Sequence, residues 1–344
     1  MANTGLVTVF GGNGFVGRHI VQRLAHAGHR VRIACRDPEA ANFLKPLGDP
    51  GQIVAVKANV AREAEVARAV EGAEWVINCV GILTSLGRNS FANVHETGAG
   101  IVARAAKSAG AKAFLHISAL GADEASKSVY AQSKARGEKA VLEAFPEATI
   151  FRPSIVVGPE DGFFNMFATI SRWSPVIPII GCPIMPKFKM RPGEDTQWRF
   201  PTFEFCDFGG TRFQPVYVGD LADAVMQALN GGNAQGKIYE ITGPKVYTFR
   251  RLMELLLRET GRSRMIVPYP IPLAYVTAFF AEMIPGKPFT RDQVHMLKTG
   301  NVLSGKHNTL LDLDIRPRGI ESILPSYLRA YRPPSKRRLR EREA

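Results

Sequence analysis

The chain has 344 residues, of which 45% are hydrophobic and 22% charged, and this composition excludes a disordered or fibrous protein. Its formal net charge of +13 favours acidic partners, such as an anionic lipid surface or the acidic face of a protein. The sequence shows neither an RNA-binding signature nor a recognition-helix pattern, so nucleic acid is not expected as a partner.

Residues 6–10 form the first predicted strand, which ends in a glycine-rich turn that opens a helix over 15–27. The turn has the spacing G-x-x-G-x-x-G, in which the first glycine permits the tight turn and the second lets the backbone approach a pyrophosphate. The third lets the helix pack closely on the strand, and the positive helix end attracts the phosphates. We therefore predict a dinucleotide site. Its turn residues are Gly11, Gly14, Phe15 and Gly17.

The second predicted strand, 30–35, leads to the side chains that decide which nucleotide is preferred. An acidic side chain about 20 residues after the turn would bind the ribose hydroxyls of NAD. This chain has Arg36 there, and a guanidinium suits the 2′-phosphate of NADP(H). The neighbouring Asp37 keeps NAD open as the alternative, because its carboxylate would favour NAD if it faced the ribose. We favour NADPH (NADP⁺) as the cofactor.

The first 157 residues alternate short apolar strands with helices. Further strands are predicted over 53–57, 75–80, 113–118 and 148–152, and further helices over 38–46, 63–71, 90–109 and 128–144. Such alternation is typical of the doubly wound α/β (Rossmann) fold, in which a parallel sheet has helices on both faces. Its ligand binds at the carboxyl ends of the strands. We therefore expect a dinucleotide-binding core over residues 1–157.

The pattern changes after residue 158, where we expect a smaller, mixed C-terminal lobe over 158–330. Residues 174–215 contain seven prolines and six phenylalanines without a clear period, and they predict an ordered excursion that packs on this protein or a partner. Beyond it, the sequence predicts a helix over 220–229, a strand over 237–241 and a helix over 248–259.

Residues 267–289 form an apolar segment that is too short and too rich in proline to span a bilayer. It is either a helix buried in the C-terminal lobe or a segment that lies against a membrane surface or a protein. A basic tail, 331–344, follows, with six basic and two acidic residues from 332 onward. These two segments are the candidate contacts with a membrane surface.

Cysteine and histidine spacing gives no indication of a metal site. The four cysteines lack a C-x-x-C pair, which favours free thiols, and the seven histidines form no metal-binding pattern. No targeting segment precedes the first predicted strand, so we expect either a mature form or a protein that works where it is synthesised, as in a bacterium.

Tyr130 and Lys134 stand four residues apart in the sequence YAQSK, which places them on one face of the predicted helix. An ammonium near a phenol stabilises the phenolate and prepares it for proton transfer. Ser118 ends the preceding strand at the ligand edge of the sheet. Its hydroxyl would hold a substrate carbonyl while Tyr130 transfers a proton and NADPH a hydride.

With these residues the chain resembles the extended short-chain dehydrogenase/reductase family. The matching motifs are GGNGFVG, NCVG at 78–81, Ser118, YAQSK, and RPSIVVGPED at 152–161. The resemblance implies a sheet of about seven strands with a smaller C-terminal lobe for the substrate. It also implies cofactor contacts at both ends of the nucleotide. Asn59 and Val60 would flank the adenine, Cys79, Val80 and Gly81 would line the cofactor, Lys134 would bind the nicotinamide ribose, and Pro153 and Ile155 would lie beside the nicotinamide. The family often has aspartate where Asn59 stands.

Four longer blocks resemble a narrower family, the NADPH-binding accessory subunits of respiratory complex I (NADH:ubiquinone oxidoreductase), over roughly residues 4–330. They are FPEATIFRPSIVVGPEDGFFNMFA, FQPVYVGDLADAV, VPYPIPLAYV and FTRDQVHML. The resemblance implies a structural NADP(H), other complex I subunits as partners, and support of the peripheral arm without turnover. It implies a peripheral location on the cytoplasmic side of a bacterial inner membrane, or on the matrix side in a mitochondrion.

Three functions are compatible with these residues. We favour a non-catalytic complex I subunit that holds NADP(H). The alternative is an NADPH-dependent reductase or epimerase that uses Ser118, Tyr130 and Lys134. A redox sensor that reports the state of NADP(H) to a partner is the third.

Overall fold

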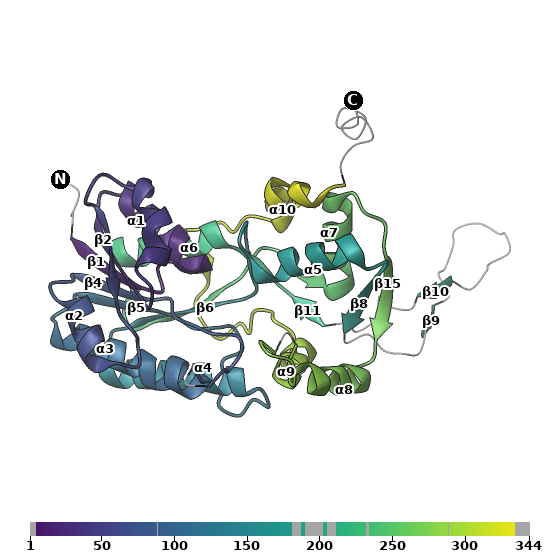
Figure 1. Ribbon diagram of the computed structural model, residues 1–344, viewed down its shortest axis with the longest axis horizontal. Helices are drawn as coiled ribbons and strands as arrows, with labels where there is room; N and C mark the ends of the chain where they lie inside the picture. The colour runs from purple at the N-terminus through teal and green to yellow at the C-terminus, as the bar shows by residue number, and fades with distance from the viewer. Residues whose placement is uncertain are drawn as a thin grey trace. The chain divides into compact units, whose positions relative to one another are not determined.

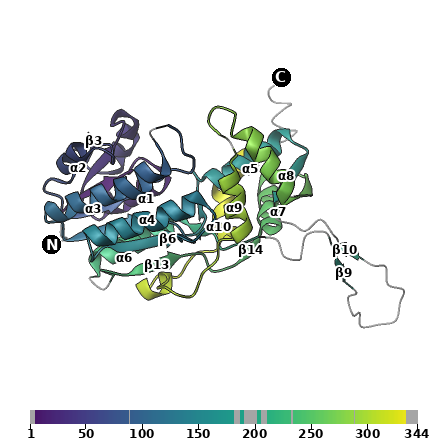
Figure 2. The ribbon, with the colours of Figure 1, turned by 90° about the horizontal axis from the view of Figure 1, so that it is seen from below.

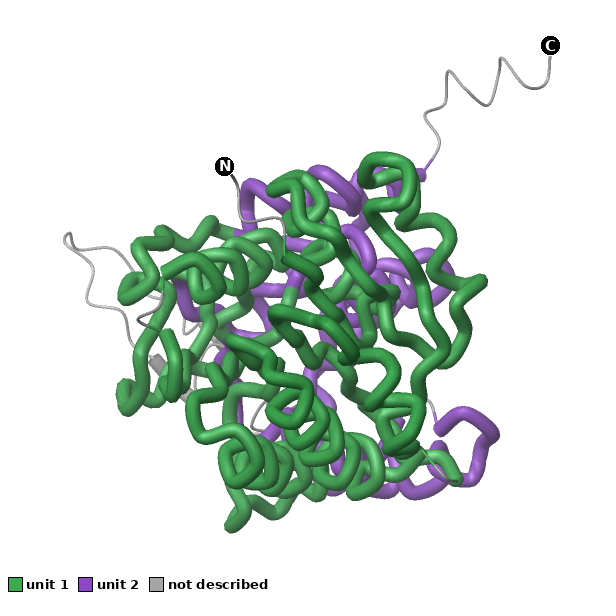
Figure 3. Tube along the Cα trace, turned by 90° about the vertical axis from the view of Figure 1, so that its left-hand side faces the viewer, with its two compact units in different colours: residues 1–156, 214–244, 302–319 green, residues 157–213, 245–301, 320–344 purple. Residues whose placement is uncertain are grey.

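The computed structural model describes residues 5–87, 89–180, 187–189, 202–204, 211–231, 234–287 and 289–333. The chain divides into two compact units (Figure 3). Unit 1 comprises residues 1–156, 214–244 and 302–319, and unit 2 comprises 157–213, 245–301 and 320–344. The C-terminal lobe expected over 158–330 is therefore not one continuous segment, because the chain returns twice to unit 1.

Unit 1 is built on a single seven-stranded parallel sheet (Figure 1). In spatial order its strands are β13 (Ile238–Ile241), β6 (Thr149–Pro153), β5 (Ala113–Ile117), β4 (Trp75–Asn78), β1 (Leu6–Phe10), β2 (Arg30–Cys35) and β3 (Ile53–Lys57). The predicted doubly wound parallel sheet is confirmed. Strand order reverses between β1 and β4, and such a switch point is where open α/β sheets bind their ligands.

Helices cover both faces of this sheet. They are α1 (Phe15–His26), η1 (Glu39–Leu47), α2 (Glu63–Val70), η2 (Ala92–Thr97), α3 (Gly98–Ser108), α4 (Val129–Ala144), α6 (Val218–Asn230) and η3 (Leu310–Leu313). Helices α1 and α6 pack together on one face, and α2, α3 and α4 lie side by side on the other (Figures 1 and 2). Two short strands, β7 (Val156–Val157) and β12 (Val216–Tyr217), pair with each other.

Two predicted helices have a different form. The helix expected over 38–46 is the 3₁₀-helix η1, and Pro46, which has no N–H to donate, stands near its end. The helix expected over 90–109 begins as the π-helix η2 and becomes α-helical only at Gly98. Apolar periodicity does not distinguish these forms from an α-helix.

The core of unit 1 lies on both faces of the sheet because successive strand residues point to opposite sides. Val9 and Ile77 belong to the cluster under α1 and α6, whereas Phe10 and Val76 belong to the cluster under α2, α3 and α4. All four side chains are fully buried. Burial on both faces explains why these strands are mostly apolar.

Unit 2 mixes short strands and helices. Its described elements are α5 (Gly162–Trp173), β8 (Val176–Ile180), β9 (Lys187–Lys189), β10 (Thr202–Glu204), β11 (Arg212–Phe213), β14 (Tyr247–Thr248), α7 (Phe249–Thr260), β15 (Met265–Tyr269), α8 (Ile271–Ala281), α9 (Arg291–Thr299), α10 (Ile320–Leu328) and η4 (Arg329–Tyr331). Strands β8 and β15 pair in parallel. None of the helices in the described part of the chain is long and apolar enough to cross a membrane.

The predicted proline-rich excursion is described only in part. Its end, Phe213, packs on Phe249 with ring centroids 5.8 Å apart, and Phe249 also contacts Phe163 and Phe167. The excursion therefore contributes to the aromatic core of unit 2. Much of the excursion and the end of the basic tail lie outside the described residues, namely 181–186, 190–201, 205–210 and 334–344.

Candidate nucleotide site

The turn after β1 has the geometry that its three glycines allow. Gly11 has φ +71°, a left-handed conformation that glycine adopts without strain, and its carbonyl accepts a 3.0 Å hydrogen bond from the N–H of Gly14. A Cβ on Gly17 would lie 2.3 Å from that same carbonyl oxygen and 2.7 Å from the Cα of Gly12. Gly17 thus permits α1 to pack against the turn, as the sequence predicts.

The amino end of α1 carries no side-chain cap from the described residues that would compete with a bound anion. Gly14 is its N-cap residue, and among the described residues no side chain caps the helix and none in its first turn is acidic. Helices α4 and α7, in contrast, are capped by Ser128 and Thr248. The first N–H groups and the positive end of α1 are therefore oriented as a phosphate requires. This end lies at the switch point between β1 and β4.

Two neighbouring residues at the end of β2, Arg36 and Asp37, differ in whether their side chains bind the protein. Asp37 Oδ1 accepts hydrogen bonds from the backbone N–H groups of Glu39 (3.1 Å) and Ala40 (3.4 Å), so its carboxylate is engaged at the start of η1. Arg36 is exposed and makes no hydrogen bond or ion pair within the described part of the chain. Arg32, on the same strand, donates instead to the carbonyls of Ala69 and Glu71 at the end of α2.

Asn59 and Val60 follow β3, on the adenine side of the predicted site. The Asn59 side chain accepts a 3.0 Å hydrogen bond from the N–H of Ala61, which fixes the local turn. Val60 is buried, and a Cβ on Gly98 would lie 2.8 Å from its Cγ2. Asn59 therefore shapes the backbone of this loop, and Val60 packs against the start of α3.

The loop after β4 passes directly over Lys134. Asn78 Oδ1 accepts a hydrogen bond from the N–H of Val80 at 3.1 Å, and a Cβ on Gly81 would lie 3.3 Å from Lys134 Nζ. Burial raises the pKa of the Cys79 thiol to about 12, partly offset by the charge of Lys134, so this thiol stays protonated. The structure thus brings the predicted cofactor-lining loop against the predicted ribose-binding lysine.

Lys134 itself is only 4% exposed. Its ammonium donates to the carbonyl of Ile117, the last residue of β5, at 3.2 Å. Burial lowers the pKa of Lys134 to about 8, and the negative charge of Glu138 partly opposes this shift. The lysine is therefore positively charged at neutral pH but close to its titration range.

The Ser118 hydroxyl donates to the carboxylate of Glu138, one turn beyond Lys134 on α4. Glu138 also forms an ion pair with Arg152, 2.6 Å from Nη2 and 2.9 Å from Nε, and Arg152 Nη1 lies 3.1 Å from His307 Nε2. Burial disfavours the charged guanidinium, but the hydrogen bonds and charge of Glu138 raise the pKa of Arg152. The hydroxyl proton of Ser118 is thus donated to Glu138, which belongs to a buried ion pair with Arg152.

Tyr130, Pro153 at the end of β6 and Ile155 just beyond it complete the predicted site. The Tyr130 ring packs edge-on against Phe91 and His95, with centroids 5.9 and 5.5 Å away. The carbonyl of Pro153 accepts a hydrogen bond from Leu120, and that of Ile155 accepts one from Val216, both at 2.9 Å. The backbone beside the predicted nicotinamide position is therefore fixed on two sides.

His95 is a site residue that sequence reasoning missed. It belongs to η2, is 1% exposed, and accepts a 2.9 Å hydrogen bond at Nε2 from the N–H of Ile82, next to the Gly81 loop. Its only sequence signal is a polar residue among the apolar positions of the helix predicted over 90–109, such as Val94 in η2 and Val102 in α3.

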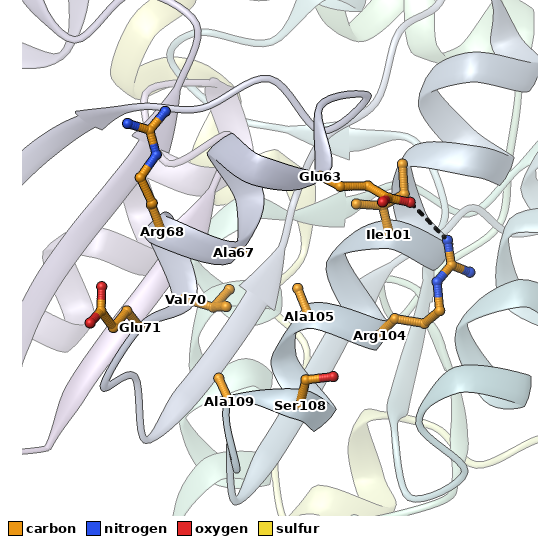
Figure 4. A pocket seen from close by; sticks show the side chains of 10 residues that line it. All are labelled: Glu63, Ala67, Arg68, Val70, Glu71, Ile101, Arg104, Ala105, Ser108 and Ala109. Atoms are coloured by element: carbon orange, nitrogen blue, oxygen red, sulfur yellow. Dashed lines mark ion pairs between the residues drawn. The ribbon is translucent and has the colours of Figure 1, made fainter.

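A surface groove of about 530 Å³ between α2 and α3 is separate from this site (Figure 4). Glu63 and Arg104 face each other across it at 4.0 Å. Its other lining residues include the helix ends at Val70 and Ser108, which lie toward the amino ends of the strands.

In the described part of the chain no group of three histidine, cysteine or acidic side chains is arranged to hold a metal ion.

Comparison with known proteins agrees with this geometry. A family model for NAD(P)H-binding domains matches residues 11–159, from the glycine turn to beyond β6. The chain is 32% identical over 339 residues to the mitochondrial NADH dehydrogenase (ubiquinone) 1 alpha subcomplex subunit 9 of Arabidopsis thaliana. The alignment covers 95% of this chain and 78% of that relative. The chain belongs to the alpha subcomplex subunit 9 family.

Two further proteins are similar to this member of the subunit 9 family, one in part of its sequence and one in its fold. A ceramide reductase of Caulobacter vibrioides is 36% identical over 180 residues, which cover 51% of this chain and 54% of that relative. The triphenylmethane reductase of Citrobacter sp., solved with NADP(H), has a TM-score of 0.67 and 15% identity. That alignment covers 93% of this chain and 99% of the reductase. It shows a shared fold. The family model over residues 11–159, described as NAD(P)H-binding, gives a nicotinamide nucleotide as the ligand class of the domain.

Proposed function

We propose that this chain holds NADP(H) as a structural ligand and supports the assembly and stability of the peripheral arm of respiratory complex I, without turnover of its own. The observation that carries the proposal is the backbone cradle formed by Gly11, Gly14 and Gly17 at the uncapped end of α1. This cradle is present in a chain that aligns over 95% of its length with a relative named as a subunit of NADH dehydrogenase.

The residues present fit such a nucleotide from end to end. The α1 turn holds the pyrophosphate, Asn59 and Val60 lie by the adenine, Cys79 and Gly81 line the middle, and Lys134 binds the nicotinamide ribose. Pro153 and Ile155 flank the nicotinamide, whose chemistry when bound is hydride transfer. A ligand that binds only the folded state stabilises it by about 4 kcal/mol at roughly 1,000 times its Kd. The nucleotide then acts as part of the core.

The preference for NADP(H) over NAD(H) rests on the end of β2. Asp37 is engaged at the start of η1, while Arg36 is exposed and available to a 2′-phosphate. We expect Arg36→Ala to weaken NADPH binding by about 10- to 100-fold and to leave NADH binding unchanged. Arg30→Ala, at the other end of the strand, is the matched control. Equal losses for NADPH and NADH would contradict this assignment.

The proposed absence of turnover is supported by two side chains that already donate hydrogen bonds within the protein. Ser118 donates to Glu138 within a buried ion pair, and Lys134 donates to a backbone carbonyl. The decisive test is to isolate respiratory membranes and purify complex I from them. We expect the chain in that fraction and NADPH in its extract. A chain found only outside that fraction would overturn the proposal.

We also propose that α8 contacts an anionic membrane surface, which gives the protein its peripheral location. Six large apolar side chains along and just after this helix are about half exposed or more. They are Leu273, Val276, Phe279, Phe280, Met283 and Ile284. Arg291 lies over the Phe279 ring at 5.5 Å and pairs with Glu282 at 2.9 Å, so a charged pair borders the apolar surface. The net charge of +13 is what favours an anionic lipid as the partner of this surface.

Vesicle flotation tests this contact. We expect the full chain to float with vesicles of phosphatidylcholine and phosphatidylglycerol, and the double variant Phe280→Ser, Met283→Ser to lose that binding. Trp173→Ser is the matched control, since Trp173 is 81% exposed on α5. Unchanged flotation of the double variant would overturn the lipid contact, and loss of complex I incorporation without any vesicle binding would assign the surface to a protein.

A second candidate function is an NADPH-dependent reductase or epimerase. The presence of Tyr130 and Lys134 on one face of α4 and the partial similarity to a ceramide reductase favour it. Hydride transfer from NADPH to a carbonyl substrate, lost in Tyr130→Phe with nucleotide binding intact, would establish this function in place of the first.

A further inference from the structure

His95 connects two parts of the nucleotide site that are distant in sequence. Because a backbone N–H can only donate, the bond from Ile82 makes His95 Nε2 an acceptor and places the ring proton on Nδ1. Nδ1 then donates to Ser133 Oγ at 2.9 Å, and Ser133 donates to the carbonyl of Tyr130 at 2.7 Å. The chain of bonds runs from the loop after β4 to the first turn of α4.

The surroundings keep this imidazole neutral and fixed. Burial, with the positive charge of Lys134, lowers the pKa of His95 to about 3, so both hydrogen bonds keep the same direction at neutral pH. The ring stacks on Phe91 at 5.5 Å and meets the Tyr130 ring edge-on at 5.5 Å. Its position therefore has little freedom.

Backbone contact reinforces the connection. A Cβ on Gly137 would lie 2.1 Å from the carbonyl oxygen of His95, so α4 and the π-helix touch at a point that only glycine permits. A π-helical turn is rare and frequently occurs at functional sites. A Cβ on Gly81 would lie 3.7 Å from His95 Nε2 and 3.3 Å from Lys134 Nζ, so both side chains flank the cofactor-lining glycine.

We propose that His95 is a positioning residue for the nucleotide: it holds the Gly81 loop and the helix that carries Tyr130 and Lys134 in one fixed arrangement. The inference rests on the proposed function, because it assigns a residue to the same NADP(H) site. A purely structural role would be met by a phenylalanine, which fills the space between Phe91 and Tyr130. The two directed bonds, to Ile82 and Ser133, distinguish the imidazole from such a ring.

Three variants of the full chain separate these roles. His95→Phe keeps the ring packing and removes both bonds, His95→Gln restores an acceptor for Ile82, and Ser133→Ala removes the link to α4. Each is measured for its NADPH dissociation constant and for its melting temperature without nucleotide. We expect His95→Phe to weaken NADPH binding by at least tenfold, because the partly buried Ile82 N–H and the Ser133 hydroxyl both lose their partner, and His95→Gln to recover most of that loss.

The outcomes are distinguishable from failure of the proposed function. A wild-type chain that binds no nucleotide overturns both proposals. A wild-type chain that binds NADPH, with His95→Phe binding it equally well, overturns the inference alone. Affinity losses that follow melting temperature in all three variants, with no recovery in His95→Gln, also overturn it. Losses in His95→Phe and Ser133→Ala that do not add in the double variant support the continuous chain of bonds.

Discussion

The glycine turn after β1 and the side chains around Lys134 belong to the same unit but are built differently. The turn uses only backbone, because any Cβ on Gly17 would meet the carbonyl of Gly11 at 2.3 Å. The second region uses side chains that are already engaged with the protein, since Ser118 donates to Glu138 and Lys134 to Ile117. The difference indicates that holding a nucleotide and transferring a proton are separable in this fold.

The largest effect is expected from breaking the second region. Glu138→Ala leaves Arg152 as an uncompensated charge whose side chain is only 16% exposed, and it removes the acceptor of Ser118. We expect the free energy of unfolding to fall by about 3–5 kcal/mol, measured by chemical denaturation. Glu147→Ala is the control, because the Glu147–Lys107 pair is exposed, and its unfolding midpoint should not change. Equal behaviour of both variants would show that the buried pair contributes nothing.

The turn gives the next largest effect. In Gly17→Ala the added methyl group meets two backbone atoms, so the turn must shift, which we expect to cost about 1–3 kcal/mol and to abolish nucleotide retention. Gly162→Ala is the matched control, because it begins α5 with no atom within 4 Å of the new Cβ. Nucleotide content of the purified protein and its melting temperature are the measurements. A Gly17→Ala protein that still retains NADPH would mean that the turn does not hold the phosphates.

Lys134 links the two regions and predicts opposite pH dependences. Its pKa is lowered to about 8 by burial, and in the proposed site the ammonium is the form that binds the nucleotide. Above pH 8, binding must take up a proton, so NADPH affinity should fall by up to about tenfold per pH unit. Lys134→Met should bind weakly at every pH and lose this slope. A wild-type affinity that is flat from pH 7 to 9.5 would remove Lys134 from the site.

The nucleotide-free protein should show the reverse sign. An unfolded chain keeps the lysine proton up to about pH 10.5, whereas the folded chain loses it from about pH 8. Between these values the unfolded state binds more protons, so the lysine's contribution to stability rises with pH. The comparison of wild type with Lys134→Met isolates this contribution from the other groups that titrate there.

The features that could be predicted from the sequence depend on residues that are close together in the chain. The glycine turn, the alternation of strands and helices and the Tyr130–Lys134 spacing each lie within one element or one turn, and the sheet followed from them. The bonds from Ser118 to Glu138 and from His95 to Ser133 join residues 20 and 38 positions apart, with no spacing rule to indicate them. His95 lies in a π-helical turn, whose residues do not follow the α-helical period of about 3.6 residues by which helices are predicted from sequence.

The smallest effect is expected from Tyr130→Phe, and it is the sharpest test of separability. The variant keeps the ring contacts with Phe91 and His95, and the carbonyl that Ser133 contacts is backbone. If the site only holds the nucleotide, loss of the hydroxyl should change the NADPH dissociation constant by less than about twofold. Incorporation into complex I should not change. Because proton transfer requires that hydroxyl, any hydride transfer that disappears in this variant would instead show that the second region is catalytic.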